Sequence, residues 1–170
     1  MNYYIADMHF YHDKILEYAK RPFKNLNEMH EVLIANWNRR VKARDNVYVL
    51  GDFAFCRGKR ANELLDRLNG KKHLIVGNHD EFLKDKEFDK GKFVWIKDHA
   101  VIKDGEHEVV LFHFPIAVWQ RRHYGSLHLY GHVHGDPRKA VFPLPQGNCA
   151  NVSADYINFE PVTLKEALFK

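Results

Sequence analysis

Five short apolar runs, each ending in aspartate, asparagine or histidine, constrain the fold of this chain more than any other feature of its sequence. The runs are strand-like, and they are Tyr3–Ala6, Val47–Leu50, Leu74–Val76, Val109–Phe112 and Leu127–Tyr130. In α/β sheets, ligand sites lie outside the carboxyl ends of the strands. We therefore expect the polar residues that follow these runs to meet in one crevice.

The last run leads into the clearest of these polar pairs. His132 and His134 lie two residues apart, so in extended backbone both imidazoles leave on the same side. Taken alone, the pair is as typical of two surface histidines as of a metal site. The other runs, however, end in the same kinds of residue. The candidate metal ligands are Asp7, His9, Asp52, Asn78, His113, His132 and His134.

This set is larger than one four-coordinate ion needs, and two ions that share a bridging carboxylate would account for it. Hard oxygen donors mixed with imidazole favour manganese, iron or zinc over a pure magnesium or calcium cage. We therefore expect two divalent metal ions, with Mn²⁺ first and iron, zinc or nickel as alternatives.

Length and composition bound the remaining possibilities. The 170 residues are expected to form one domain, 1–170, and 45% hydrophobic with 28% charged residues is typical of a folded soluble chain. The formal net charge of +4 suits an anionic substrate, and without a dense basic tract nucleic acid is not favoured. No leader is visible before Asp7, and the longest apolar stretch, 109–119, is too short to span a bilayer. We expect a cytoplasmic protein with no membrane attachment and no obligate protein partner.

Between the runs, apolar residues at helical spacing predict helices over Asn27–Lys42 and Gly58–Asn69. The second helix connects two of the strand-like runs, which predicts a βαβ unit with parallel strands. Asp104-Gly105 predicts a hairpin turn. A proline-rich loop is expected over 137–147, and a short helix near the C-terminus ends at Phe169. These elements indicate a single mixed α/β domain.

The blocks Asp7-x-His9, Gly51-Asp52, Gly77-Asn78-His79-Asp80, His113 and Gly131-His132-x-His134 resemble, in order, the five motifs of the calcineurin-like metallophosphoesterase superfamily. The resemblance covers almost the whole chain. It implies a β-sandwich of two mixed sheets flanked by helices, with a dinuclear centre at the strand ends. Carried over by position, Asp7, His9, Asp52 and His134 would hold one ion. Asp52, Asn78, His113 and His132 would hold the other, so that Asp52 bridges the pair.

The implied activity is metal-dependent phosphoester hydrolysis, in which the ions activate a bridging water or hydroxide for in-line attack on phosphorus. The resemblance makes His79 the general acid and Asp80 its orienting partner; the alternative is a loop histidine with no catalytic role. Weaker candidates for contact with the substrate are His12, Arg21, Arg121, Arg122 and His123. A solvated basic loop or a helix cap would explain those residues as well.

Two departures separate the chain from the Ser/Thr protein phosphatase branch. The segment 51–58 lacks that branch's Asp-Arg pair, and the third block ends in Asp80 instead of glutamate. The chain is more similar to small bacterial and phage phosphodiesterase-type members. We therefore predict a phosphodiesterase for a small phosphoester or nucleotide-type substrate. The alternatives are a phosphomonoesterase or protein phosphatase, and a catalytically inactive metal-binding scaffold for a protein partner.

Overall fold

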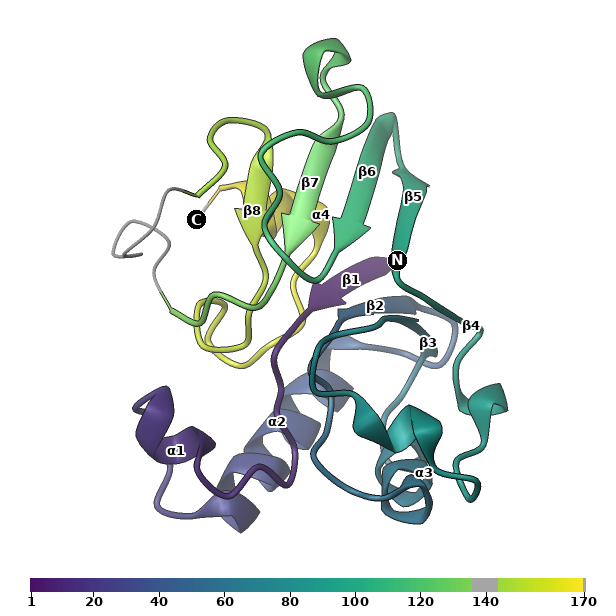
Figure 1. The fold of residues 1–170 in the computed structure, drawn as a ribbon, viewed down its shortest axis with the longest axis vertical. Helices are drawn as coiled ribbons and strands as arrows, with labels where there is room; N and C mark the ends of the chain where they lie inside the picture. The colour runs from purple at the N-terminus through teal and green to yellow at the C-terminus, as the bar shows by residue number, and fades with distance from the viewer. Residues whose placement is uncertain (136–143, 170) are drawn as a thin grey trace.

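Two four-stranded sheets organise the molecule in the computed structural model, which describes residues 1–135 and 144–169 (Figure 1). The first sheet has the order β1-β2-β3-β4, and the second has the order β5-β6-β7-β8. The strands of the first sheet are β1 (Asn2–Ile5), β2 (Asn46–Leu50), β3 (Lys71–Ile75) and β4 (Trp95–Lys97). Those of the second are β5 (His99–Asp104), β6 (His107–Phe112), β7 (Leu127–Tyr130) and β8 (Cys149–Asn151).

All neighbouring strands of the first sheet are parallel, and an isolated antiparallel bridge between Tyr4 and Val162 adds to its edge. Parallel sheets need crossover helices, which here are α2 (Leu26–Arg40) and α3 (Gly58–Asp66). Both helices lie on the lower side of this sheet in Figure 1. The predicted βαβ unit is confirmed, because α3 connects β2 to the parallel strand β3.

The second sheet begins with the predicted hairpin. Strands β5 and β6 pair antiparallel, and Gly105 takes a left-handed φ of 60° in the turn between them. Strands β6, β7 and β8 are then parallel, so their carboxyl ends lie at one end of the sheet. The short helix α4 (Leu164–Leu168) starts with a capping box between Thr163 and Glu166.

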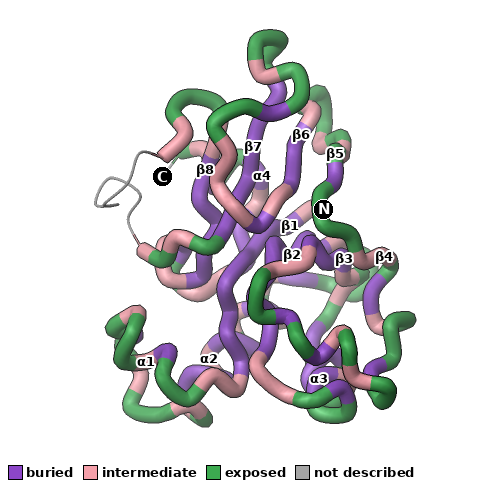
Figure 2. Tube along the Cα trace, in the orientation of Figure 1, coloured by how far each residue is buried: buried purple, intermediate pink, exposed green. Residues whose placement is uncertain are grey.

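One buried hydrophobic cluster joins the two sheets, and it includes Tyr4 of β1, Leu50 of β2 and Leu129 of β7. Figure 2 shows the same pattern, with the strands buried and the outer turns exposed. The predicted fold class, two mixed sheets flanked by helices, is confirmed. Figure 1 also shows the four-residue helix α1 (Ile15–Tyr18) standing apart from the sheets.

The helix predicted to end at Asn69 ends at Asp66 instead. There the backbone tightens into i→i−3 turns, because the N–H groups of Arg67 and Leu68 donate to the carbonyl oxygens of Leu64 and Leu65. Side chains of α2 bind carbonyl groups just beyond the helix. Asn38 Nδ2 donates to the carbonyl oxygen of Arg67, and Trp37 Nε1 donates to that of Asn69. Most of the predicted loop 137–147 lies outside the described residues. Within 1–135 and 144–169, no helix combines the length and apolar content needed to cross a membrane.

Candidate metal centre

The loops that follow β1, β2, β3, β6 and β7 lie near one another (Figure 1). Contacts between their side chains bring the seven candidate ligands into one region. Ligand atoms of Asp7, His9 and His134 all lie within 4.8 Å of one another, as do those of Asp7, Asp52 and His113. We call Asp7, His9 and His134 the first group, and Asn78, His113 and His132 the second group. Asp52 lies between them.

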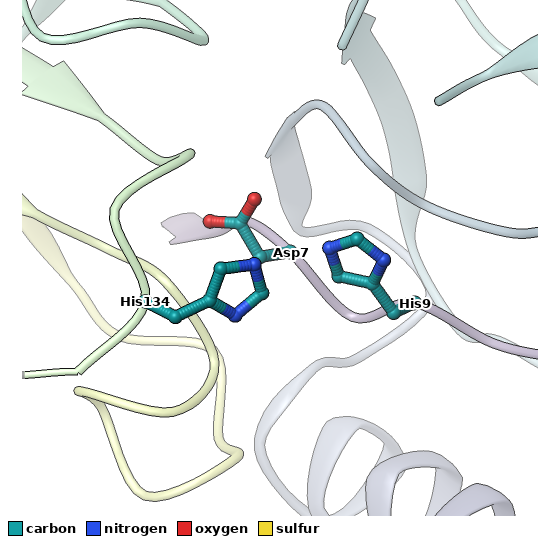
Figure 3. Close-up of side chains that lie close together, drawn as sticks. All are labelled: Asp7, His9 and His134. Atoms are coloured by element: carbon teal, nitrogen blue, oxygen red, sulfur yellow. The ribbon is translucent and has the colours of Figure 1, made fainter. Parts of the chain in front are cut away.

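The first group is drawn in Figure 3, where Asp7 and His9 come from the loop after β1 and His134 lies beside them on the loop after β7. Asp7 Oδ1 and both ring nitrogens of His9 are buried and have no hydrogen-bond partner. Buried polar atoms almost always have a partner, and an exception calls for an explanation such as an ion. A cation bound between a carboxylate and two imidazoles would satisfy Asp7 Oδ1 and one ring nitrogen of His9.

The second group points to a cation by its hydrogen-bond chemistry. His113 Nδ1 lies 2.8 Å from the carbonyl oxygen of Leu50, to which it donates, so the neutral ring carries its lone pair on Nε2. That nitrogen faces Asn78 Oδ1 at 3.0 Å, and His132 Nδ1 lies 3.2 Å from the same oxygen. Two lone pairs that face each other without a proton repel, whereas a cation between them is bound by both.

Asp52 connects the groups through one oxygen. Its Oδ2 lies 3.5 Å from His9 Nε2 and 3.6 Å from His113 Nε2. Two donors each bound at about 2.1 Å to one tetrahedral ion lie about 3.4 Å apart. The other oxygen, Oδ1, accepts the backbone N–H of His79 at 2.9 Å. The arrangement leaves Oδ2 free to bridge two ions.

Strained backbone places these side chains. Asp7, His9, Asp52 and His132 all have positive φ angles, of 54°, 51°, 53° and 68°. Left-handed conformations are rare for residues other than glycine, and where they cluster they mark sites held in place by their surroundings. The site is also closely packed, since a Cβ on Gly77 would collide with Asp52 Oδ1. The donor set and its cramped geometry fit two cations.

Burial sets the protonation of the ligands. It lowers the pKa of His9 to about 2, with the charges of His134 and Arg21 adding to the effect. Burial also lowers the pKa of His132, and it raises that of the fully buried carboxyl of Asp7. Neutral imidazole is the form that binds metal, so both histidines are ready to act as ligands.

A layer of residues behind the first group was not predicted from the sequence. His134 Nδ1 lies 2.6 Å from Asp155 Oδ2, and Arg21 binds both oxygens of Asp155 at 2.8 and 2.9 Å. Burial raises the pKa of Asp155, but hydrogen bonds from His134 and Arg21 outweigh it and lower that pKa to about 2. Likewise burial lowers the pKa of His134, yet the bond to Asp155 and the charge of Asp7 raise it overall.

The prediction that Arg21 contacts a substrate is wrong. Its side chain is completely buried and, besides Asp155, it donates to the carbonyl oxygens of Asp7 and Met8. Every one of these contacts faces the protein, so the guanidinium is committed to the loop that carries Asp7 and His9.

The structure places Arg121, Arg122 and His123, also candidates for contact with substrate, away from the candidate metal centre. They belong to the connection that contains η3 (Arg122–Tyr124), at the amino end of β7. His132 and His134 follow the carboxyl end of that strand, and Figure 1 shows the connection at the far tip of the second sheet. Arg122 is bound there to the carbonyl oxygens of Ala117 and Gln146.

The expected pairing of Asp80 with His79 does not occur among the described residues. The Asp80 carboxylate is buried and accepts backbone N–H groups from Asp52, Phe53 and Gly77 at 3.1, 2.7 and 2.8 Å. Burial raises the pKa of Asp80 to about 6, although the hydrogen bonds from Gly77 and Phe53 act to lower it. Asp80 therefore ties the loop after β2 to the loop after β3 and does not orient the His79 ring.

His79 itself is exposed beside the centre, and its ring centroid lies 5.9 Å from that of His9 and 4.7 Å from that of Phe55. His12 also lines this side, because its ring stacks on Phe55 at 4.0 Å and lies 6.5 Å from His79. The structure therefore brings His79 and His12 together with the seven ligands, and leaves Arg121, Arg122 and His123 apart from them.

Comparison with known proteins gives close and distant relatives. The uncharacterized protein MJ1445 of Methanocaldococcus jannaschii is 37% identical over 165 residues, which cover 95% of this chain and 86% of that protein. The crystal structure of AQ665 from Aquifex aeolicus, a protein of unknown function, matches with a TM-score of 0.75 and 28% identity, over 98% of this chain and 96% of that one. The phosphoesterase YfcE of E. coli is more distant, with a TM-score of 0.43 and 13% identity over 96% and 81% of the two chains. No protein-family model matches.

The chain belongs to one family with the M. jannaschii protein MJ1445. The two sheets, with the candidate ligands in five loops at their carboxyl ends, agree with the fold that the resemblance to calcineurin-like metallophosphoesterases implies.

Proposed function

We propose that the protein is a metal-dependent phosphoester hydrolase, and specifically a phosphodiesterase for a small or nucleotide-type substrate. The observation that supports it most is the convergence of seven aspartate, asparagine and histidine ligands from five loops, with unpartnered lone pairs at their centre. The proposal includes two ions, with Mn²⁺ as the preferred metal, and the cytoplasm as the place of action.

In this proposal Asp7, His9, Asp52 and His134 hold one ion, and Asp52, Asn78, His113 and His132 hold the other. When bound, the ions supply Lewis-acid stabilisation of charge on the phosphoryl oxygens and lower the pKa of an attacking water. The chain's own part is to fix the geometry. Asp52 presents one oxygen to both groups, and the backbone N–H of His79 keeps its other oxygen occupied.

His79 is the proposed general acid. Its backbone is fixed to Asp52, while its ring is exposed, so the ring can reach the leaving oxygen of a bound ester from the solvent side. Proton transfer to that oxygen avoids the expulsion of an alkoxide, an effect worth about 10²- to 10⁴-fold in rate. Phe55 packs against the ring and limits where it can lie.

Hydrolysis of a diester is favoured over that of a monoester by two features. The segment 51–58 lacks the Asp-Arg pair of the protein phosphatases. In addition, Arg21, the one buried arginine in the described part of the chain, is bound to Asp155 and to backbone carbonyls. Because this guanidinium is not available to match the second charge of a monoester, we expect the singly charged diester to be the better substrate.

The test is the hydrolysis of bis-p-nitrophenyl phosphate against p-nitrophenyl phosphate by protein reconstituted with Mn²⁺. We expect faster turnover of the diester, and loss of turnover when the metal is removed by a chelator. Preference for the monoester would replace the phosphodiesterase by a phosphomonoesterase. Bound Mn²⁺ without turnover of either ester would favour a metal-binding scaffold.

A further inference from the structure

The segment 151–155 lies outside the five motifs, yet it contacts two of the three residues of the first group. It binds the ring of His134 and the backbone on either side of it, and it binds one carboxylate oxygen of Asp7. Asn151 Nδ2 donates to the carbonyl oxygens of Val133 and Gly135, at 2.8 and 3.1 Å, and these residues flank His134. The backbone that carries the His134 ring is therefore fixed on both sides by one buried amide.

The same segment orients two ligand side chains. Ser153 Oγ, which is fully buried, donates to Asp7 Oδ2 at 2.6 Å and leaves Oδ1 without a partner. Asp155 Oδ2 lies 2.6 Å from His134 Nδ1, so the proton of the neutral ring is on Nδ1 and the lone pair is on Nε2. These contacts use Asp7 Oδ2 and His134 Nδ1, and they leave Asp7 Oδ1 and His134 Nε2 for an ion.

Arg21 connects this segment to β1. Its Nε and one terminal nitrogen bind the two oxygens of Asp155, and its terminal nitrogens donate to the carbonyl oxygens of Asp7 and Met8 at 2.6 and 2.8 Å. This planar fork fits a carboxylate in a way that lysine cannot reproduce. One guanidinium therefore sets the distance between the loop that carries Asp7 and the residue that orients His134.

Within residues 1–135 and 144–169, the second group has no such layer of charge. His113 Nδ1 donates to the neutral carbonyl of Leu50, whereas His134 Nδ1 faces the anionic Asp155. A carboxylate behind a histidine ligand makes that ligand more basic and holds its orientation, and loss of such a partner typically costs about 10- to 100-fold in metal affinity.

We propose that Ser153 and Asp155, with Arg21 behind them, are positioning residues for the metal ion held by Asp7, His9 and His134. This inference rests on the metal centre of the proposed function. It extends that centre to a sixth segment of the chain and assigns the segment to one of the two ions.

The test is calorimetric titration of chelator-treated, full-length protein with Mn²⁺, in the absence of substrate. For Asp155→Ala we expect one binding event weakened about 10- to 100-fold and the other unchanged. Asp155→Asn keeps an acceptor for His134, and its affinity should lie between the alanine variant and the wild type. The matched control is Asp66→Asn, which removes an exposed carboxylate paired with Lys92 and should change neither event.

A second variant shows which of the two ions the weakened binding event belongs to. In His132→Ala, which removes a ligand of the second group, the remaining Mn²⁺ should bind about 10- to 100-fold more weakly when Asp155→Ala is added. Ser153→Ala, which deletes only a hydroxyl, should weaken the same event if Asp155→Ala does not fold. Wild-type affinity in both Asp155→Ala and Ser153→Ala would overturn the positioning role, even if their melting temperatures fell. Wild-type protein that binds Mn²⁺ but hydrolyses neither ester would overturn the proposed function and leave this inference standing.

Discussion

The two groups of ligands solve the same problem in different ways. The first group takes its support from charged and hydroxyl side chains, since Asp155 faces His134 and Ser153 donates to Asp7. The second group takes its support from the main chain, where the carbonyl oxygen of Leu50 fixes the ring of His113. The charged and hydroxyl partners belong to the segment that follows β8, whereas the carbonyl group belongs to the last residue of β2. The first group is therefore the half of the centre that single substitutions and acid should disturb most.

The largest effect is expected where the two groups meet. Asp52→Asn keeps the shape of the shared ligand but removes its charge, so both binding events should weaken and turnover should fall. Loss of several kcal/mol of charge stabilisation corresponds to about 1000-fold or more in kcat. Metal analysis after dialysis at fixed free Mn²⁺, together with steady-state rates, measures both. If only one event weakened, Asp52 would belong to one group and would not be the bridge.

His79→Ala should separate chemistry from metal binding. The His79 ring lies outside both groups, so both Mn²⁺ affinities should stay at wild-type values. The rate should fall by about 10²- to 10⁴-fold for a diester with an alkyl leaving group. It should fall far less for a nitrophenyl leaving group, which needs no proton. Equal losses for the two esters would contradict the general-acid role, and His12→Ala serves as the comparison from the same aromatic side.

Acid should disturb the first group before the second, because His30 supports the loop that carries it. The backbone N–H of Tyr11 donates to His30 Nε2 at 2.9 Å, which requires a neutral ring, and burial lowers the pKa of His30 to about 4. An unfolded histidine titrates near 6.5, so between pH 6.5 and 4 the unfolded state takes up a proton that the folded state refuses. The free energy of unfolding should therefore fall as the pH falls through this window, by at most about 3 kcal/mol from this residue.

His30→Gln removes that titration and should flatten the stability curve between pH 6.5 and 4, as followed by urea unfolding. His73 is the matched control, because burial also lowers its pKa to about 4 while its ring lies beside Tyr48 and Trp95. His73→Gln should also make the stability curve less steep. Mn²⁺ binding at pH 5 should stay unchanged in His73→Gln, because His73 does not support the loop that carries the first group, whereas it should change in His30→Gln. A slope in His30→Gln equal to that of the wild type would show that other groups control the acid response.

The sequence was most informative where a ligand follows a strand directly. Asp7, Asp52 and His113 come at the ends of apolar runs, and the sheet brings such positions together without help from other signals. The same pattern could not reveal Asp155, which follows the three-residue strand β8 at a distance of four residues and gains its meaning only from His134 and Arg21.

Side-chain direction explains the predictions that failed. Asp80 was paired with His79 because the two are neighbours in sequence, but the Asp80 carboxylate is buried against backbone N–H groups while the His79 ring is exposed. Arg21 is a candidate for contact with substrate from the sequence alone, because arginine is usually exposed, and only its partner 134 positions away shows that it is buried. Contacts of this range leave no local pattern to detect.

The smallest expected effect concerns the second group and its packing. A Cβ on Gly77 would meet Asp52 Oδ1 and, at 2.9 Å, the Cα of Gly51, so Gly77→Ala must push the loop before Asn78 outward. Overpacking of this kind costs about 1 to 3 kcal/mol, which should appear in the unfolding free energy. Gly91→Ala is the matched control, because the Cβ there would meet only the Asp89 side chain, at 3.0 Å. If main-chain support is what holds the second group, Gly77→Ala should also weaken the Mn²⁺ event that Asp155→Ala leaves unchanged. Weakening of the other event instead would show that the two groups share their support, and the contrast between them would not hold.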